Sequence, residues 1–265
     1  LMTIEENDSV VTTYRDHGHM IARGLDPKKI MAELTGRSTG YSKGKGGSMH
    51  MFSKENNFYG GHGIVGAQVP IGTGIAFTHK YKNQKNICRT YIGDGAMNNG
   101  QVFESFNLAS LWKLPALYII ENNKYGMGTS VNRAAAGSDL YKRGEAFGIS
   151  GSIVDGMNVF KVIDAAQKAG DFVRKGKGPY ILEVQTYRYR GHSMSDPAKY
   201  RSKEELDSYK LNDPIEIVSQ EILKKKILSK ENLDTMNKEI IKEIKEAAEY
   251  ALESPYPDKS ELFTD

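Results

Sequence analysis

Two short motifs combine glycine with oxygen-bearing side chains and form the best candidate for a ligand site. The first is Gly93-Asp94-Gly95-Ala96, and the second covers residues 121–126 and includes Asn123. Asp94 offers a carboxylate oxygen and Asn123 an amide oxygen, which suit Mg²⁺ when phosphate oxygens complete its shell. The glycines would let the backbone approach a diphosphate closely. Each motif alone is also a common turn, but the pair favours a metal–diphosphate site over two unrelated turns.

The segments around these motifs predict that both reach the same edge of a sheet. Residues 87–92 and 116–120 are apolar runs of strand length, and residues 101–113 between them have helical spacing. The 26 residues between Gly95 and Asn122 leave room for one helix and a returning strand. Ligands of parallel α/β sheets bind at the carboxyl ends of the strands. We therefore expect the two motifs to lie close together, facing the positive end of the intervening helix.

The rest of the chain extends this alternation. Residues 64–81 and 158–175 have helical spacing, and residues 180–186 form another strand pattern. Strands that alternate with helices predict an α/β fold with a mainly parallel sheet and helices on both faces. From Pro214 onward the sequence is amphipathic and helical, with breaks at Ser229 and at Ser254-Pro255. We predict an α/β domain over residues 1–205 and a helical C-terminal segment over residues 206–265.

Composition excludes several classes of protein. The chain has 265 residues and a formal net charge of +3, which argues against a dedicated nucleic-acid binder. No apolar run approaches the roughly 18 residues of a membrane helix, and Cys88 is the single cysteine, which fits a reducing compartment. The first residues lack the pattern of a signal peptide. Because the chain begins with Leu1 rather than methionine, we expect that upstream residues are missing.

One glycine motif imitates a dinucleotide-binding site. Residues 61–66 have the spacing G-x-G-x-x-G. That fingerprint requires a strand immediately before it and an acidic residue about 20 positions later. Residues 51–59 are polar and broken, and the acidic residue is lacking. We therefore reject NAD binding and interpret the motif as a close-packed glycine loop.

The longer sequence segments around the two polar motifs resemble a known protein family. The segments that carry the resemblance are residues 46–51 (GGSMHM), 63–66 (GIVG), 103–107 (FESFN), 121–128 (ENNKYGMG) and 187–197 (YRYRGHSMSDP). They are similar to the α subunits of thiamine-diphosphate-dependent 2-oxo acid dehydrogenases, most strongly those of the pyruvate branch, from about Val10 to the last helix. The resemblance implies a thiamine-diphosphate-binding fold and an α2β2 heterotetramer that holds the cofactor between an α and a β chain.

The same resemblance implies an activity and a place in the cell. The expected reaction is the oxidative decarboxylation of pyruvate, with transfer of the acetyl group to the lipoyl domain of dihydrolipoyl acetyltransferase. The expected cofactors are thiamine diphosphate and Mg²⁺. The expected location is the bacterial cytoplasm or the mitochondrial matrix.

Residue by residue, the resemblance assigns roles to eleven positions. Asp94 and Asn123 match Mg²⁺ ligands, together with the backbone carbonyl of Tyr125. The positions that match cofactor contacts are Tyr14, Arg15, Gly63, Val65, Gly95, Ala96 and His192. Tyr14 and Arg15 would hold the phosphates, where a guanidinium fork is chemically suited. His192, on a loop, and His17 match catalytic histidines, although each could also be a surface residue of a polar loop.

Part of the chemistry must come from a partner. The carboxylate that activates the aminopyrimidine ring belongs to the β subunit in this family, and Glu104 follows the diphosphate turn on a helix that faces elsewhere. We therefore expect this chain alone to bind the cofactor weakly and not to turn over. The family's α chains also begin earlier, with helices and an aromatic-histidine loop near the substrate, and nothing in this sequence matches that part.

Two alternative functions remain open at this point. One is the α subunit of an acetoin or branched-chain 2-oxo acid dehydrogenase. The other is a non-catalytic interaction subunit, against which the intact Asp94, Asn123, Arg15 and His192 argue. A panel of substrates tested with the β partner would separate the first alternative, and a cofactor titration the second.

Two structural expectations complete the analysis. The glycine- and alanine-rich helix over residues 64–78 should lie at a subunit interface or in another deep contact, and the alternative is ordinary packing of a helix on the sheet. Gly72→Leu should break assembly before it unfolds the chain. The polar and cationic stretch over residues 187–203 should be a mobile loop above the cofactor edge of the sheet. Ser193 in this stretch matches a serine that a dedicated kinase phosphorylates in mitochondrial relatives.

Overall fold

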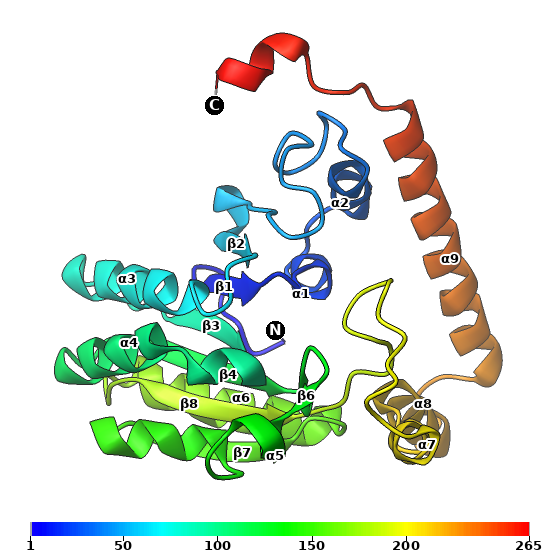
Figure 1. Ribbon diagram of the computed structural model, residues 1–265. Helices are drawn as coiled ribbons and strands as arrows, with labels where there is room; N and C mark the ends of the chain where they lie inside the picture. The colour runs from blue at the N-terminus through cyan, green and yellow to red at the C-terminus, as the bar shows by residue number, and fades with distance from the viewer. Residues whose placement is uncertain (1, 265) are drawn as a thin grey trace. The chain divides into compact units, whose positions relative to one another are not determined.

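The computed structural model describes residues 2–264, which divide into two compact units. The first unit comprises Thr12–Gly63 and the chain from Ile222 onward, and the second comprises Met2–Val11 and Ile64–Glu221. Figure 1 shows the ribbon with its helices and strands. No helix in the described part of the chain is long and apolar enough to cross a membrane.

A parallel sheet forms the centre of the second unit. Its strands are β1 (Ser9–Thr13), β3 (Cys88–Gly93), β4 (Ala116–Asn122), β8 (Tyr180–Gln185) and β7 (Ser150–Asp155). They follow one another in this spatial order, and each neighbouring pair is parallel. The central strand β4 is the most apolar, and its residues from Ala116 to Ile120 are all buried. The predicted strands at 87–92, 116–120 and 180–186 are therefore confirmed to within two residues.

Helices cover both faces of this sheet. They are α3 (Gln68–Tyr81), α4 (Gly100–Leu111) and α6 (Val159–Arg174). The crossover from β3 through α4 to β4 moves along the sheet in one direction, and the crossover from β7 through α6 to β8 moves in the other. Because such crossovers are right-handed, α4 and α6 lie on opposite faces. The predicted α/β class, with a mainly parallel sheet and helices on both faces, is confirmed.

The ends of these helices follow from local chemistry. Asn158 caps α6, and its side chain accepts hydrogen bonds from the backbone N–H groups of Phe160 and Lys161, both at 3.1 Å. The helix expected from residue 64 begins only at Gln68, because Gly66 has a left-handed backbone with φ +89°. Sequence patterning missed β1 and β7, since β7 is half exposed and lacks a continuous apolar run.

The first unit is built around two packed helices, α2 (Pro27–Leu34) and α9 (Lys230–Glu253). Small side chains let them approach: Ala32 of α2 and Ala247 and Ala251 of α9 are fully buried or nearly so. This unit also contains α1 (His17–Ala22) and β2 (Phe58–His62). β2 is an edge strand beside β1, whose Thr12 hydroxyl donates to the Gly60 carbonyl at 3.0 Å. The sequence pattern predicts broken structure over residues 51–59. In the structure, β2 begins at Phe58 and runs into the glycine motif at Gly61 and His62.

The remaining elements are short or lie near the C-terminus. They are α5 (Val131–Ala134), α7 (Lys203–Lys210), α8 (Pro214–Lys224), the hairpin of β5 (Tyr125–Gly126) and β6 (Thr129–Ser130), and the 3₁₀ helices η1 (Lys54–Asn56), η2 (Asp94–Asn98), η3 (Leu140–Phe147) and η4 (Lys259–Phe263). The predicted helical C-terminal part is confirmed, including the break at Ser229, which forms a capping box with Asn232. The predicted domain boundary at residue 205 stays a prediction.

Gly72 packs closely against the sheet inside the second unit. A Cβ atom at this position would lie 1.9 Å from the Thr90 hydroxyl of β3, so the glycine lets α3 approach the sheet. Whether this helix also lies at a subunit interface stays a prediction. Gly74 is different, because a Cβ there would meet nothing within 4 Å.

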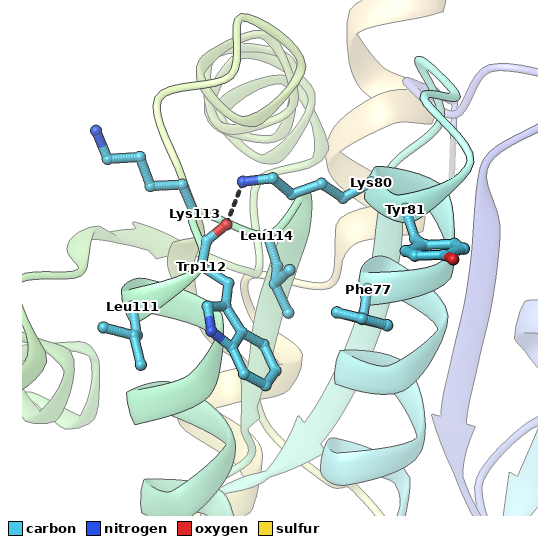
Figure 2. A pocket seen from close by; sticks show the side chains of 7 residues that line it. All are labelled: Phe77, Lys80, Tyr81, Leu111, Trp112, Lys113 and Leu114. Atoms are coloured by element: carbon cyan, nitrogen blue, oxygen red, sulfur yellow. Dashed lines mark hydrogen bonds between the residues drawn. The ribbon is translucent and has the colours of Figure 1, made fainter.

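A hollow of about 510 Å³ lies between the end of α3 and the connection from α4 to β4. Figure 2 shows its lining, in which Phe77 and Trp112 face each other and Lys80 donates a hydrogen bond to the Trp112 carbonyl. The ring centroids of Phe77 and Trp112 are 5.5 Å apart. This hollow precedes β4, so it lies at the opposite end of that strand from Asn122 and Asn123.

Candidate active site

The two polar motifs meet at the carboxyl edge of the sheet in the second unit. β3 and β4 are neighbours, with Gly93 opposite Glu121 in the register. Asp94 therefore follows directly after β3 at the level where β4 ends. The backbone N–H of Asn123 lies 3.4 Å from the Asp94 carboxylate. The prediction that both motifs lie at one edge on adjacent strands is confirmed.

Two glycines bring the backbones of these motifs into contact. A Cβ atom on Gly95 would lie 3.4 Å from the Gly126 Cα, and one on Gly126 would lie 3.3 Å from the Gly95 Cα. Side chains at these positions would force the η2 turn and the β5–β6 hairpin apart. Ala96, which follows, is 4% exposed.

Asp94 is held as a nearly buried carboxylate. It is 4% exposed, and burial raises the pKa of its carboxyl group, while hydrogen bonds from its own backbone N–H and that of Asn123 and the charges of Arg188 and Lys124 act in the opposite direction. A buried anion with so few donors is suited to a bound cation. The described residues contain no group of three or more His, Cys, Asp or Glu side chains that could hold a metal. A cation here would thus use one carboxylate with amide, carbonyl and ligand oxygens, which is the pattern of Mg²⁺ with a phosphate.

The two other predicted metal ligands are already oriented. The Asn123 side-chain oxygen accepts a hydrogen bond from the Tyr125 N–H at 3.3 Å, which fixes the turn. The Tyr125 carbonyl accepts a hydrogen bond from Arg188 at 2.9 Å. Arg188 also donates to the Met127 carbonyl at 2.7 Å. One guanidinium thus joins the β5–β6 hairpin to the stretch that carries His192.

The stretch over residues 187–202 contains no helix or strand, as predicted. Asp196 organises it by accepting hydrogen bonds from the His192 N–H at 2.6 Å and from the Tyr200 hydroxyl at 2.8 Å. Hydrogen bonds from the backbone N–H groups of His192 and Ala198 lower the pKa of Asp196 to about 2. His192 therefore lies on a loop that is organised around the ionised carboxylate of Asp196. The mobility of this loop stays a prediction.

Glu205, in α7, is a contact that the sequence analysis missed. Its carboxylate accepts hydrogen bonds from the hydroxyls of Tyr125 and Tyr187, each at 3.0 Å. Burial and this carboxylate raise the pKa of Tyr187 to about 12. Tyr187 also stacks on Tyr209 with ring centroids 3.9 Å apart. Nothing in local spacing indicates the contact, because Tyr125 and Glu205 are 80 residues apart.

Val65 lies at the start of the second unit. Its carbonyl accepts hydrogen bonds from the side chains of Asn99 at 3.0 Å and Gln101 at 3.3 Å. The backbone of this predicted cofactor contact is therefore fixed to the beginning of α4. Its side chain is 49% exposed.

The other predicted residues belong to the first unit. Tyr14 and Arg15 directly precede α1, with the Arg15 guanidinium 5.8 Å from the centroid of the Tyr14 ring. Gly63 lies against His50, since a Cβ on Gly63 would be 3.0 Å from the imidazole carbon of His50. His17 opens α1, and its Nε2 atom is 2.9 Å from the Ser48 carbonyl. The structure thus adds Ser48 and His50 to the neighbourhood of the predicted residues.

A buried glutamate shapes the loop that carries Ser48 and His50. The Glu33 carboxylate accepts hydrogen bonds from the backbone N–H groups of Ser42 at 2.7 Å, Gly44 at 2.9 Å, Gly46 at 2.8 Å and Gly47 at 3.1 Å. Glu33 is fully buried. Such a nest of N–H groups around one anion fixes a glycine-rich loop in a single conformation.

Comparison with known proteins assigns the family. The sequence matches the family described as "Dehydrogenase E1 component" over residues 1–260, and the chain belongs to this family. A protein of Rickettsia conorii named "Pyruvate dehydrogenase E1 component subunit alpha" is 56% identical over 263 residues, which cover 99% of this chain and 81% of that protein.

Relatives from other organisms carry the same name. The protein of Rhizobium meliloti is 56% identical over 265 residues, which cover all of this chain and 76% of that protein. A mitochondrial protein of Dictyostelium discoideum is 52% identical over 263 residues, which cover 98% of this chain and 69% of that protein. The resemblance seen in the sequence motifs is therefore confirmed.

Proposed function

We propose that this chain is the α subunit of a thiamine-diphosphate-dependent pyruvate dehydrogenase component. It would take part in the oxidative decarboxylation of pyruvate and the transfer of the acetyl group to lipoyl groups of dihydrolipoyl acetyltransferase. The observation that carries the proposal is the 56% identity to relatives with that name over nearly the whole chain. The oxygen donors gathered at the ends of β3 and β4 support it independently.

In the second unit, the residues fit a cation that carries a diphosphate. Asp94 would supply the anionic ligand, Asn123 its amide oxygen and Tyr125 its backbone carbonyl. Gly95 and Ala96 would present backbone groups to the diphosphate, and the contact between Gly95 and Gly126 leaves no side chain in the way. Val65 would contact the aminopyrimidine ring through the backbone that Asn99 fixes.

In the first unit, four residues have proposed roles. Tyr14 and Arg15 would hold phosphate oxygens, and Gly63 would contact the aminopyrimidine ring through its backbone. His17 would exchange a proton with the reacting group, as would His192 of the second unit. When bound, thiamine diphosphate supplies the electron sink for loss of CO₂, and these side chains supply position and charge.

The proposal requires partners. A β subunit would complete an α2β2 heterotetramer and supply the activating carboxylate, and a lipoyl domain would receive the acetyl group. We propose the bacterial cytoplasm or the mitochondrial matrix as the location, which fits the origins of the relatives.

Reconstitution with a β subunit of a close bacterial relative tests the proposal. The mixture should release CO₂ from pyruvate only with thiamine diphosphate and Mg²⁺, and it should acetylate a lipoyl domain. The α chain alone should give less than about one hundredth of that rate, because it lacks the activating carboxylate. Equal rates with and without the β subunit would contradict the proposed division of labour.

A substrate panel tests the alternative within the family. Acetoin and branched-chain 2-oxo acids should react at least tenfold more slowly than pyruvate under the same conditions. A preference for acetoin or a branched-chain acid would replace pyruvate in the proposal. Failure of every substrate, together with failure of the mixture to bind thiamine diphosphate, would favour the non-catalytic interaction subunit.

A further inference from the structure

Asp16 is a buried carboxylate with no hydrogen-bond partner in the part of the chain that the structure describes. It is fully buried, and neither of its side-chain oxygens accepts a hydrogen bond. Its neighbour Gly61 of β2 is so close that a Cβ there would lie 2.1 Å from the Asp16 Oδ2 atom. Native proteins rarely leave a buried anion unsatisfied unless it has a task.

Asp16 precedes α1 but does not cap it. It occupies the N-cap position, and its side chain makes no capping hydrogen bond. Asp26 occupies the same position before α2, is exposed, and accepts a hydrogen bond from the Lys28 N–H at 2.8 Å. Capping therefore explains Asp26 and does not explain Asp16.

His17 lies in salt-bridge range of Asp16. The distance between Asp16 Oδ1 and His17 Nε2 is 3.6 Å, and the His17 side chain is 41% exposed. The same nitrogen lies 2.9 Å from the Ser48 carbonyl oxygen and 3.1 Å from the Ser48 hydroxyl. A carbonyl oxygen can only accept, so Nε2 must carry a proton and donate it. In the neutral ring, Nδ1 is then the basic atom.

We propose that Asp16 is a positioning residue that stabilises the imidazolium form of His17, while Ser48 fixes the ring so that Nδ1 exchanges the proton with the bound reactant. Nδ1 takes one proton from a hydroxyl of the reactant, and the ring becomes an imidazolium with both nitrogens protonated. The same proton later leaves from Nδ1, and the ring returns to its neutral form. Asp16 stays ionised throughout. This inference rests on the proposed catalytic role of His17.

Electrostatics agree with this arrangement. Burial raises the pKa of Asp16 to about 6, and the charge of His17 is the largest influence in the opposite direction. The charge of His19 of α1 and the backbone N–H groups of Asp16 and Met51 also favour the ionised carboxylate, although neither N–H group has hydrogen-bonding geometry with it. β2 contributes Gly61, which has no charge. Asp16 is therefore ionised at neutral pH, as the proposal requires, and burial leaves its charge little screened by water.

Histidine NMR of the full chain tests the inference without reference to turnover. The chain has six histidines, so ¹⁵N-labelled histidine gives few signals, and His17→Gln identifies that of His17. The neutral His17 ring should carry its proton on Nε2. Asp16→Asn should lower the imidazolium fraction of His17 near pH 7 about threefold or more, since an opposite charge at this range favours the charged form. Asp26→Asn is the matched control and should leave that fraction unchanged.

Kinetics of the assembled α and β chains supply the second readout. Asp16→Asn should lower kcat about tenfold, shift the pH profile and leave KM for pyruvate within twofold, because the change affects proton transfer rather than binding. Urea unfolding checks that Asp16→Asn is folded. If it is not, Asp16→Ala serves as the second variant.

The outcomes separate the inference from the proposed function. A neutral His17 ring protonated on Nδ1, or an imidazolium fraction that is the same in Asp16→Asn and Asp26→Asn, would overturn the inference. Absence of pyruvate decarboxylation by the wild-type mixture would overturn the proposed function, and the NMR result would still decide whether Asp16 controls His17.

Discussion

Two regions of the first unit contain buried carboxylates that differ in the hydrogen bonds they accept. In the last turn of α2, the Glu33 carboxylate accepts hydrogen bonds from four backbone N–H groups of the following loop. At the start of α1, the Asp16 carboxylate accepts none. Both side chains are fully buried. Burial alone therefore does not distinguish them, and the number of donors around each anion does.

The difference separates a structural anion from one that is available for chemistry. Glu33 has its hydrogen-bonding capacity filled by the loop that it shapes, so its charge stabilises the fold. Asp16 costs the fold free energy, and the nearby charge of His17 is the largest contribution that offsets this cost. Asp94 of the second unit is intermediate, with a 3.4 Å hydrogen bond from Asn123 and a pKa raised by burial. Perturbed, poorly satisfied groups of this kind are typical of functional sites.

The largest expected effect is the loss of cofactor binding in Asp94→Ala. The substitution removes the carboxylate that would neutralise a cation carrying a diphosphate, at a position that is 4% exposed. Thiamine diphosphate affinity in the presence of Mg²⁺ should fall at least about 10³-fold, roughly 4 kcal/mol. Isothermal titration of the α and β mixture measures this.

Asp155→Ala is the matched control, because Asp155 also ends a strand of the same sheet and pairs with Lys161 at 3.1 Å. Its affinity should equal that of the wild type. Unchanged affinity in Asp94→Ala would remove the basis for placing the metal at this edge.

Glu33→Gln should give the next largest effect, on stability. In the wild type, each carboxylate oxygen of Glu33 accepts two of these four hydrogen bonds. In the variant, an NH₂ group replaces one oxygen and faces two backbone N–H donors, so two of the four hydrogen bonds are lost. The free energy of unfolding should fall by roughly 3 to 4 kcal/mol, since hydrogen bonds to charged groups are the stronger kind. Urea unfolding followed by circular dichroism measures the loss. A change below about 1 kcal/mol would show that the loop does not depend on this anion.

These carboxylates also show what the sequence could and could not predict. The Asp94 and Asn123 pair was found because strand ends in an α/β pattern fix where side chains gather, and the family motifs agree. The roles of Glu33 and Asp16 were not found, because they depend on whether loop backbone N–H groups reach each carboxylate, and loop conformation has no periodic signal. β2 and β7 were missed because short strands with glycine or partly exposed residues do not produce an apolar run. β1 was missed because its only apolar residues are Val10 and Val11.

The pH dependence of stability should report Asp16 directly. Its pKa is raised from 3.8 to about 6 in the folded chain, so the folded state binds more protons than the unfolded state between these values. The free energy of unfolding therefore decreases as pH rises from about 4 to about 6, and the decrease reaches roughly 3 kcal/mol above pH 6. Asp16→Asn should remove this decrease. Urea unfolding at pH 4.5, 5.5 and 7.5 measures the slope in both proteins.

We expect Asp16→Asn to be as stable as the wild type at pH 4.5 and more stable than the wild type at pH 7.5. Such a result, combined with reduced activity, is the signature of a residue retained for function at a cost in stability. Identical pH slopes in the two proteins would show that Asp16 is not the anion that burial destabilises.

The smallest expected effect comes from Asp26→Ala, which tests whether the comparison depends on contacts or on position. Asp26 and Asp16 both occupy N-cap positions, but only Asp26 accepts a hydrogen bond from its helix. Asp26→Ala should lower the free energy of unfolding by about 1 kcal/mol, the usual value for a lost cap. Asp26→Ser should restore most of it, because serine also caps. Asp16→Ala should not lower stability at pH 7.5, since no capping bond is lost and a buried charge is removed. Equal losses in Asp26→Ala and Asp16→Ala would mean that the N-cap position, and not the hydrogen bonds around each carboxylate, determines what these aspartates contribute.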